Sequence, residues 1–265
     1  RGSTHTTITD PNFKSVRQRA NAELRNDNMS NVFRQTGSAG GAEYFNVLGE
    51  MPVRYFSRSG FDEVSKVSGA GMAETILSGV STCHACVIAC GRKVIIPDGP
   101  YARGESKGPE YETIVGFGPN LEIGDLAAIT HLGQLCDSLG LDTISMSNTV
   151  GLAFMMFDRG VITPADTGGL ELKWGDPAAA EALIRLTANR EGFGEYVALG
   201  ARALAKHFGV EEMAVQVNGL EVAYHDPRGG TGMGLVYATS PRGACHNQSD
   251  YFMVEIGGAQ PEIGV

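Results

Sequence analysis

The sequence is short of basic residues and has no long apolar run. It holds 21 lysines and arginines against 30 aspartates and glutamates, which gives a net charge of -9. Nucleic-acid binding needs basic stripes that displace counterions, and none appears, so no nucleic-acid partner is expected. A membrane-spanning helix needs about 18 or more apolar residues in a row, and none occurs, so no membrane partner is expected. No signal peptide is visible either.

Cysteines are also few. The five cysteines are odd in number, and three of them crowd into one short segment. A secreted disulfide framework uses paired, spread-out cysteines, so this pattern argues against one and favours a reducing, cytoplasmic compartment. The sequence begins with Arg1 rather than methionine, so we expect residues of the protein to be missing before it.

Apolar residues and glycines are abundant. The chain has 265 residues and a mass of 28.0 kDa, with 42% hydrophobic residues, enough for a sizeable core in one large domain or two modest ones. The 36 glycines cluster at 36–41, 68–71 and 229–234. Such clusters are typical of tight turns and of close backbone approaches, including those to a bulky cofactor.

Helical periodicity dominates, so the predicted fold class is mainly α. A helix is expected over 11–35, with Asp10 as N-cap and Pro11 at its first position. Another is expected over 61–80, ending near Gly79. Residues 36–60 read as irregular, and 93–96 as a short strand.

The stretch 124–209 is strongly helical, since apolar residues recur there at helical spacing. Helices are expected to start at Thr163-Pro164 and Asp176-Pro177. They are expected to stop at Gly160, Gly192 and Gly209. We divide the chain into a helical domain, 1–215, and the start of a second, incomplete domain, 216–265.

The three crowded cysteines are Cys83, Cys86 and Cys90, in a C-x2-C-x3-C spacing. Thiolates are soft ligands that suit iron–sulfur clusters or zinc. A turn followed by a helical turn would place all three sulfurs on one side. Zinc usually takes paired C-x2-C knuckles, which favours an iron–sulfur cluster, although zinc or three unrelated core cysteines stay open. A four-iron cluster normally needs a fourth cysteine, for which Cys136 and Cys245 are available.

An acidic motif, Gly108-Pro109-Glu110-Tyr111-Glu112-Thr113, follows. Two close carboxylates raise each other's pKa, which can produce a general base that works near neutral pH. In extended backbone both glutamates would point the same way, so the sequence does not decide between them. Surface acids on a turn are the commoner case.

Two further motifs present polar groups. In Asp137-Ser138-Leu139-Gly140-Leu141-Asp142, Asp137 could accept hydrogen bonds from ring N–H groups of a ligand, or the motif could simply end a helix at Gly140. The segment from His225 to Asn247 does not match the dinucleotide fingerprint, but it presents three basic groups to a ligand. These are Arg228, Arg242 and His246.

Taken together, the motifs resemble the aldehyde:ferredoxin oxidoreductase family of tungsten-pterin enzymes. The likeness rests on C-x2-C-x3-C at 83–90, GPEYET at 108–113, DSLGLD at 137–142, and DPRGGTGMG with YATSPRGACH at 226–246. They occur in the family's order and at about its spacing. The resemblance implies the multi-helical fold of the family's domains 2 and 3.

The resemblance also implies roles for individual residues. Cys83, Cys86 and Cys90 would be three ligands of a [4Fe–4S] cluster. Asp137, Gly140 and Leu141 would bind one pterin of a tungsten (or molybdenum) bis-pterin, and Arg242 would face it. Glu112 would act as base and His246 would polarise the carbonyl, beside Tyr111.

On this resemblance the reaction is aldehyde oxidation to a carboxylic acid under anaerobic conditions, with electrons passing to ferredoxin. The family's β-rich first domain and its second D-x-x-G-L-C motif, which supplies the fourth cluster cysteine, are absent here. The chain alone is therefore expected to be incomplete and inactive. Its expected partners are ferredoxin, an aldehyde, the remaining domains of the same enzyme and a further copy in a homo-oligomer. Two alternatives stay open: a relative acting on another substrate, such as an aromatic acyl thioester, and an iron–sulfur electron-transfer module without an active site.

Overall fold

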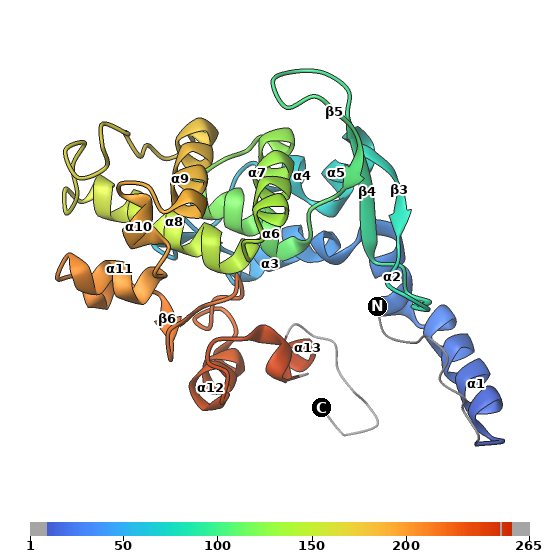
Figure 1. The fold of residues 1–265 in the computed structure, drawn as a ribbon. Coiled ribbons are helices and arrows are strands. Elements are labelled where there is room, and N and C mark those ends of the chain that lie inside the picture. Colours follow the sequence, from blue (N-terminus) through green and yellow to red (C-terminus); the bar gives the residue numbers. More distant parts are fainter. Residues whose placement is uncertain (1–9, 250, 256–265) are drawn as a thin grey trace.

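The computed structural model describes residues 10–249 and 251–255 and has the mainly α architecture that the sequence predicted (Figure 1). Most helices gather into one body, and a small antiparallel sheet lies at one end of it. The larger helices of the body are α6 (Tyr111–Phe117), α7 (Leu126–Leu139), α8 (Thr143–Asp158), α9 (Pro177–Asn189) and α11 (Ala201–His207). Among the described residues, no helix combines the length and apolar character that crossing a membrane requires.

The predicted helix over 11–35 forms as two helices. They are α1 (Phe13–Asn26), which points away from the body and buries no residue, and α2 (Asn28–Thr36). The chain breaks at Asp27, whose extended backbone lets its carboxylate accept a hydrogen bond from the Ser30 N–H. The expectation that Asp10 caps the first helix is wrong, because α1 has Asn12 in the N-cap position.

Two further expectations in the first third of the chain are wrong. The stretch 36–60 contains a 3₁₀ turn and helix α3 (Ala42–Leu48), followed by short strands β1 (Pro52–Val53) and β2 (Arg58–Ser59). The expected helix over 61–80 is replaced by α4 (Val64–Val67), α5 (Gly69–Thr75) and strand β3 (Leu77–Ser81), which contains Gly79. The predicted strand at 93–96 is confirmed within β4 (Gly91–Ile96). This strand pairs antiparallel with β3 and with β5 (Arg103–Lys107).

The helical stretch 124–209 is confirmed. Asp176 caps α9 with Pro177 at its first position, as predicted, and accepts hydrogen bonds from two backbone N–H groups. A short helix, α10 (Gly194–Val197), lies between α9 and α11. Gly160, Gly192 and Gly209 follow helix ends with φ of 70°, 52° and 71°. The helix start expected at Thr163-Pro164 is wrong, because Asp166 accepts from both the N–H and the hydroxyl of Thr163 and closes a local turn.

Helix α6 is the centre of the core, because all seven of its residues are buried. Gly116 allows the closest approach: a Cβ there would lie 2.2 Å from the Oγ of Ser147 on α8 and 2.7 Å from Cε2 of Tyr224. This tight packing fixes α6 against α8, and the first turn of α6 carries the acidic motif.

The last part of the chain returns to this core. A small hairpin of β6 (Gln216–Val217) and β7 (Leu220–Glu221) leads to Tyr224, which is fully buried. Helices α12 (Thr231–Thr239) and α13 (Tyr251–Glu255) follow. The domain boundary at 215/216 stays a prediction. The final segment of the predicted second domain, 256–265, lies outside the described residues.

An unusual turn packs against Tyr224. Arg54, Tyr55 and Phe56 are three consecutive non-glycine residues with positive φ, at 48°, 48° and 58°. The Tyr55 hydroxyl accepts a hydrogen bond from the Val215 N–H at 2.9 Å, and the Phe56 ring stacks on Tyr224 with centroids 6.0 Å apart. Side-chain contacts therefore hold a backbone shape that L-residues rarely adopt.

Candidate active site

The two glutamates of the acidic motif point to different places, because the backbone between them is helical rather than extended. Glu110 precedes α6 and accepts a hydrogen bond from the Ser38 hydroxyl at 2.5 Å. Glu112 lies in the first turn of α6, is 9% exposed, and accepts a hydrogen bond from the Tyr224 N–H at 2.9 Å through Oε2. The structure thereby distinguishes two carboxylates between which the sequence could not decide. Glu112 is the one that enters the core.

Glu112 meets a histidine that the sequence analysis did not single out. His225 is 4% exposed, and its Nε2 lies 3.3 Å from Glu112 Oε1. On the other side of the ring, Nδ1 lies 2.9 Å from Oε1 of Glu50, which is 2% exposed. A buried imidazole thus lies between two buried carboxylates from distant parts of the chain.

Tyr111 completes this buried cluster. Its ring stacks on His225 with centroids 4.9 Å apart, and its hydroxyl donates to the Tyr224 carbonyl at 3.0 Å. Burial first, and then the charges of Glu112 and Glu50, raise the pKa of Tyr111 well above its usual value. Tyr111 is therefore a neutral hydrogen-bond donor at physiological pH.

His246, in the 3₁₀ turn His246–Gln248, lies at the edge of the cluster. Its ring centroid is 5.5 Å from that of His225. Burial lowers the pKa of His246; Glu112 opposes this shift, and His225 and Arg242 add to it. A lowered pKa keeps the imidazole neutral near pH 7, and a neutral imidazole can still donate its one N–H to a carbonyl oxygen. The predicted catalytic residues Glu112, Tyr111 and His246 therefore gather in one place.

A small cleft of about 150 Å³ opens beside Glu112. It is also lined by Asp137, whose side chain is about half exposed and lies 3.4 Å from the Lys107 ammonium. Small-molecule sites usually have about 300–1,000 Å³, so this cleft forms only one wall of such a site. The carboxylates along it accept hydrogen bonds, which fits a ligand whose ring carries N–H groups.

The rest of the DSLGLD motif ends helix α7. Gly140 adopts a left-handed conformation with φ of 72°, and its N–H donates to the Asp137 carbonyl. The N–H of Leu141 donates to the Cys136 carbonyl at 2.9 Å. These two bonds form a Schellman motif, so the helix-end interpretation of Gly140 describes the local backbone. Binding of a pterin by Asp137, Gly140 and Leu141 stays a prediction.

The three clustered cysteines lie on the loop between β3 and β4. Cys83 and Cys86 are exposed and Cys90 is half-buried. The expected helical turn is wrong, because residues 82–90 form turns and bends and include positive φ values of 58° at Ala85 and Ala89.

The loop conformation directs backbone donors at one sulfur. The N–H groups of Ile88 and then Ala89, with a smaller contribution from the Thr82 hydroxyl, lower the pKa of Cys86. A lowered pKa favours the thiolate, which is the form that binds metal. The loop therefore directs N–H groups at one thiolate, and contacts of this kind tune iron–sulfur clusters in proteins that hold them.

Two arginines tie the cysteine loop to α2. Arg34 donates to the Val87 carbonyl at 3.1 Å. Arg92, 2% exposed, donates to the Ala89 carbonyl at 2.8 Å and, at the end of α2, to the Arg34 and Gln35 carbonyls at 2.9 and 3.0 Å. One buried guanidinium thereby fixes the loop and caps the helix.

The residues present fit a cluster in type but do not form a closed site. Cys90 lies within electrostatic reach of Cys86 and Cys83, since both contribute to the rise of its pKa after burial and Glu110. Within 10–249 and 251–255, no three potential ligands are close enough together to hold a metal ion. Burial raises the pKa of Cys136 to about 12, and Cys245 is also buried, whereas Cys83 and Cys86 on the loop are exposed.

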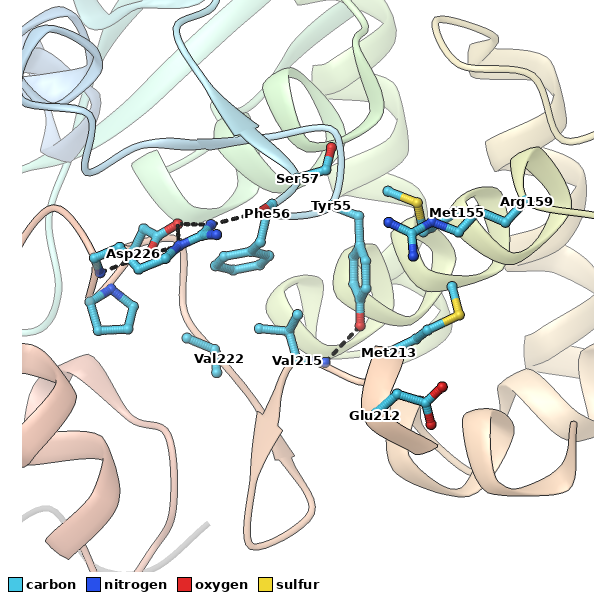
Figure 2. Close-up of a pocket in the computed structure, with 12 residues that line it drawn as sticks. Tyr55, Phe56, Ser57, Met155, Arg159, Glu212, Met213, Val215, Val222 and Asp226 are labelled. Carbon is cyan, nitrogen blue, oxygen red and sulfur yellow. Dashed lines mark hydrogen bonds and ion pairs between the residues drawn. The ribbon is translucent and has the colours of Figure 1, made fainter. Parts of the chain in front are cut away.

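A larger hollow of about 560 Å³ is lined in part by Asp226, the residue after His225 (Figure 2). Its walls include Tyr55, Phe56 and Val222. Arg228, which the sequence presented to a ligand, forms an ion pair with Asp226 and donates to the Phe56 carbonyl at 2.5 Å. Arg242 is exposed and near His246. Its contact with a pterin stays a prediction.

Sequence reasoning missed Glu50 and His225. No local pattern marks Glu50, because it lies in the turn after α3 and becomes important only through a partner 175 residues away. His225 had a weak signal, since it directly precedes the Asp226-Pro227-Arg228-Gly229-Gly230 segment. That signal could have marked His225 as a candidate site residue, but it could not have predicted that the ring contacts Glu112.

Comparison with known proteins identifies the class to which this fold and site belong. Residues 15–263 match the family described as aldehyde ferredoxin oxidoreductase, domains 2 & 3. The chain is 37% identical over 245 residues to a tungsten-containing aldehyde ferredoxin oxidoreductase of Pyrococcus furiosus. It is 35% identical over 245 residues to its namesake from Thermococcus kodakarensis. These alignments cover 92% of this chain. The chain belongs to the aldehyde ferredoxin oxidoreductase family, whose named relatives are oxidoreductases.

Further comparison shows how much of its relatives the chain covers and how varied these relatives are. The chain spans about 40% of the length of those curated relatives. It is also 31% identical over 229 residues to the aliphatic sulfonate oxidoreductase, WOR-like subunit, of Pyrococcus furiosus, covering 82% of this chain and 36% of that one. The active-site complex BamBC of benzoyl coenzyme A reductase matches with a TM-score of 0.58 and 17% identity. That match covers 74% of this chain and 29% of that one, and shows a shared fold.

Proposed function

We propose that the chain is the central part of a tungsten-pterin, iron–sulfur oxidoreductase that converts aldehydes to carboxylic acids. The observation that carries this proposal is the convergence of Glu112, Tyr111 and His246 on one buried cluster beside the cleft lined by Asp137. Family membership supports the redox class. The names of the tungsten-containing relatives support the metal and the aldehyde.

The chain's own residues would move and place protons. Glu112 is the base: one oxygen is fixed by the Tyr224 N–H, and the other, Oε1, lies 3.3 Å from His225 Nε2 without a hydrogen bond of good geometry and would take a proton from water or from the hydrated aldehyde. His246, neutral near pH 7, donates an N–H to the carbonyl oxygen and polarises it. Tyr111 packs on the imidazole of His225 and keeps the cluster in place.

The proposed cofactors fit the donors in the chain. Cys83, Cys86 and Cys90 would hold three corners of a [4Fe–4S] cluster, and a fourth ligand would come from beyond this chain. Asp137 would accept hydrogen bonds from the ring N–H groups of a pterin. When bound, the tungsten-pterin supplies the two-electron oxidation and the cluster passes electrons to ferredoxin.

Replacing Glu112 by glutamine tests the proposal in the full-length protein. Losing a positioned base typically costs ~10²–10⁴-fold in rate, so aldehyde turnover should fall by that order while metal content stays normal. Glu105→Gln, on β5, is the matched control, because that carboxylate is exposed and pairs with the Lys93 ammonium at 2.8 Å; its turnover should change less than tenfold.

Two results would overturn the proposal. Equal turnover of Glu112→Gln and the unaltered protein would show that Glu112 is not the base. Oxidation of aliphatic sulfonates with no turnover of any aldehyde would place the protein beside its WOR-like relative instead.

A further inference from the structure

The carboxylate–imidazole–carboxylate row of Glu50, His225 and Glu112 is buried although all three side chains can carry a charge. The three residues are 2%, 4% and 9% exposed. Glu50 follows α3, His225 follows β7 and Glu112 lies in α6, so three separate segments meet here. A buried charge is costly unless it is paired, so this arrangement needs an electrostatic explanation.

The imidazole is held on several sides. Tyr111 stacks on one face, with the ring planes 23° apart, and Phe45 meets the ring edge-on at 81°. The Tyr237 hydroxyl donates to the His225 carbonyl at 3.1 Å. The ring therefore has one orientation, with Nδ1 toward Glu50 and Nε2 toward Glu112.

The backbone holds Glu50 just as firmly. Its carbonyl accepts the Asp226 N–H at 2.8 Å. Gly229 lies so close that a Cβ there would be 2.7 Å from the Glu50 Cα. The glycine cluster noted in the sequence thus lets the loop after His225 pack directly against the Glu50 backbone.

The positions of the protons follow from this geometry. A neutral imidazole has one N–H and one lone pair. If Nδ1 donates to Glu50, a neutral ring turns its Nε2 lone pair toward Glu112 Oε1 at 3.3 Å, and two acceptors face each other. A second proton on the ring removes this conflict and reduces the net charge of the buried row from two negative charges to one.

Glu112 Oε1 also needs a positively charged partner. It is buried, and no hydrogen bond of good geometry reaches it from the described residues. An imidazolium at 3.3 Å is a charge partner for this oxygen, and a carboxylate oxygen facing one N–H keeps a second lone pair to accept a proton from substrate.

We propose that Glu50 and His225 are positioning residues for Glu112. Glu50 holds His225 as a doubly protonated imidazolium, and the imidazolium keeps Glu112 ionised and oriented. This inference rests on the proposed role of Glu112 as base. It adds no redox or covalent step: one O–H bond of the substrate breaks as one O–H bond forms on Glu112.

Other titratable groups facing His225 do not replace this pairing. His246 is neutral near pH 7 because burial lowers its pKa. Burial raises the pKa values of Tyr111 and Tyr237, so both are neutral phenols. Glu50 and Glu112 lie 2.9 and 3.3 Å from the two ring nitrogens and can balance a positive charge there, whereas the neighbouring Asp226 forms an ion pair with Arg228.

Nitrogen NMR of the full-length protein, labelled with ¹⁵N-histidine, tests the protonation state without relying on turnover. His225→Gln assigns the signal. Both ring nitrogens of His225 should be protonated from pH 6 to pH 8. A bare nitrogen at pH 7 in the unaltered protein would overturn the proposal, and this measurement needs no variant beyond the one used for assignment.

Variants then test the link to Glu112. In Glu50→Gln, an isosteric change, one His225 nitrogen should lose its proton by pH 8. In that variant the acidic limb of the kcat/KM profile should move to higher pH with metal content unchanged. Glu50→Asp should restore part of the imidazolium signal. His207→Gln, on α11, is the control and should leave the His225 signal unchanged.

The outcomes separate this inference from the proposed function. A doubly protonated His225 in a protein that turns over no aldehyde leaves the pairing intact and removes the function. Aldehyde turnover with an unshifted acidic limb in Glu50→Gln keeps the function and overturns the positioning role.

Discussion

Arg92 offers the most direct test of how the cysteine loop is held. Its three hydrogen bonds of 3.0 Å or less go to carbonyls of Ala89, Arg34 and Gln35. Each bond from a charged donor contributes about 1.5–3 kcal/mol. Lysine keeps the charge, but its single nitrogen cannot span carbonyls on both the loop and the helix, so Arg92→Lys should lose at least one bond.

The expected local destabilisation is therefore about 1.5–3 kcal/mol, which raises the equilibrium constant for local opening roughly 10- to 140-fold at 1.4 kcal/mol per tenfold. Hydrogen exchange by mass spectrometry on peptides covering 28–36 and 82–92 measures this opening within the full-length protein. Arg58→Lys is the matched control, because Arg58 is exposed and forms a surface ion pair with Glu122, so its effect should stay within about 0.5 kcal/mol. Exchange in Arg92→Lys within threefold of the unaltered protein would refute the reasoning.

Three further predictions concern single side chains. Asp137→Ala should lower the pterin and tungsten content of the full-length protein with its circular dichroism unchanged, and a normal cofactor content would contradict the assignment. In the metal-free protein, iodoacetamide should modify Cys86, whose pKa is lowered by backbone N–H groups, well before Cys136, whose pKa is raised to about 12 by burial; peptide mapping over time decides the order. The lowered pKa of His246 makes the unfolded chain bind more protons below its usual value of 6.5. Stability should therefore be full above that pH and fall as the pH drops through the folded-state pKa, and this slope should flatten in His246→Gln when thermal melts are compared from pH 7.5 to 5.

Local pattern predicted the parts of the fold that local physics controls. The helices between 124 and 209 have an apolar face, and Asp176 with Pro177 forms a helix start that needs no distant partner. The same reasoning failed at Thr163-Pro164, where the Asp166 side chain closes a turn on the Thr163 N–H before a helix can begin. It also failed at Gly79, since pairing with β4 makes a strand there.

The candidate site likewise has residues that the sequence could predict and residues that it could not. Glu112, Tyr111 and His246 carry recognisable motifs, so the sequence named them, but it could not say that Glu110 turns away toward Ser38. Glu50 could not be found at all, because its importance comes from a bond to His225 across 175 residues. Long-range contacts of this kind have no signature in a window of neighbouring residues.

The left-handed turn at Arg54, Tyr55 and Phe56 has a consequence for how the protein can change. Each such residue costs roughly 1–2 kcal/mol relative to the right-handed form, so glycine would suit the backbone better. Glycine at position 55 would, however, remove the hydroxyl that accepts a hydrogen bond from the Val215 N–H. Glycine at position 56 would remove the ring that stacks on Tyr224. Backbone preference and side-chain packing therefore make opposite demands at the same positions. Few substitutions can therefore relax this turn without cost, and one that does should loosen the segment after β7 that carries Tyr224 and His225.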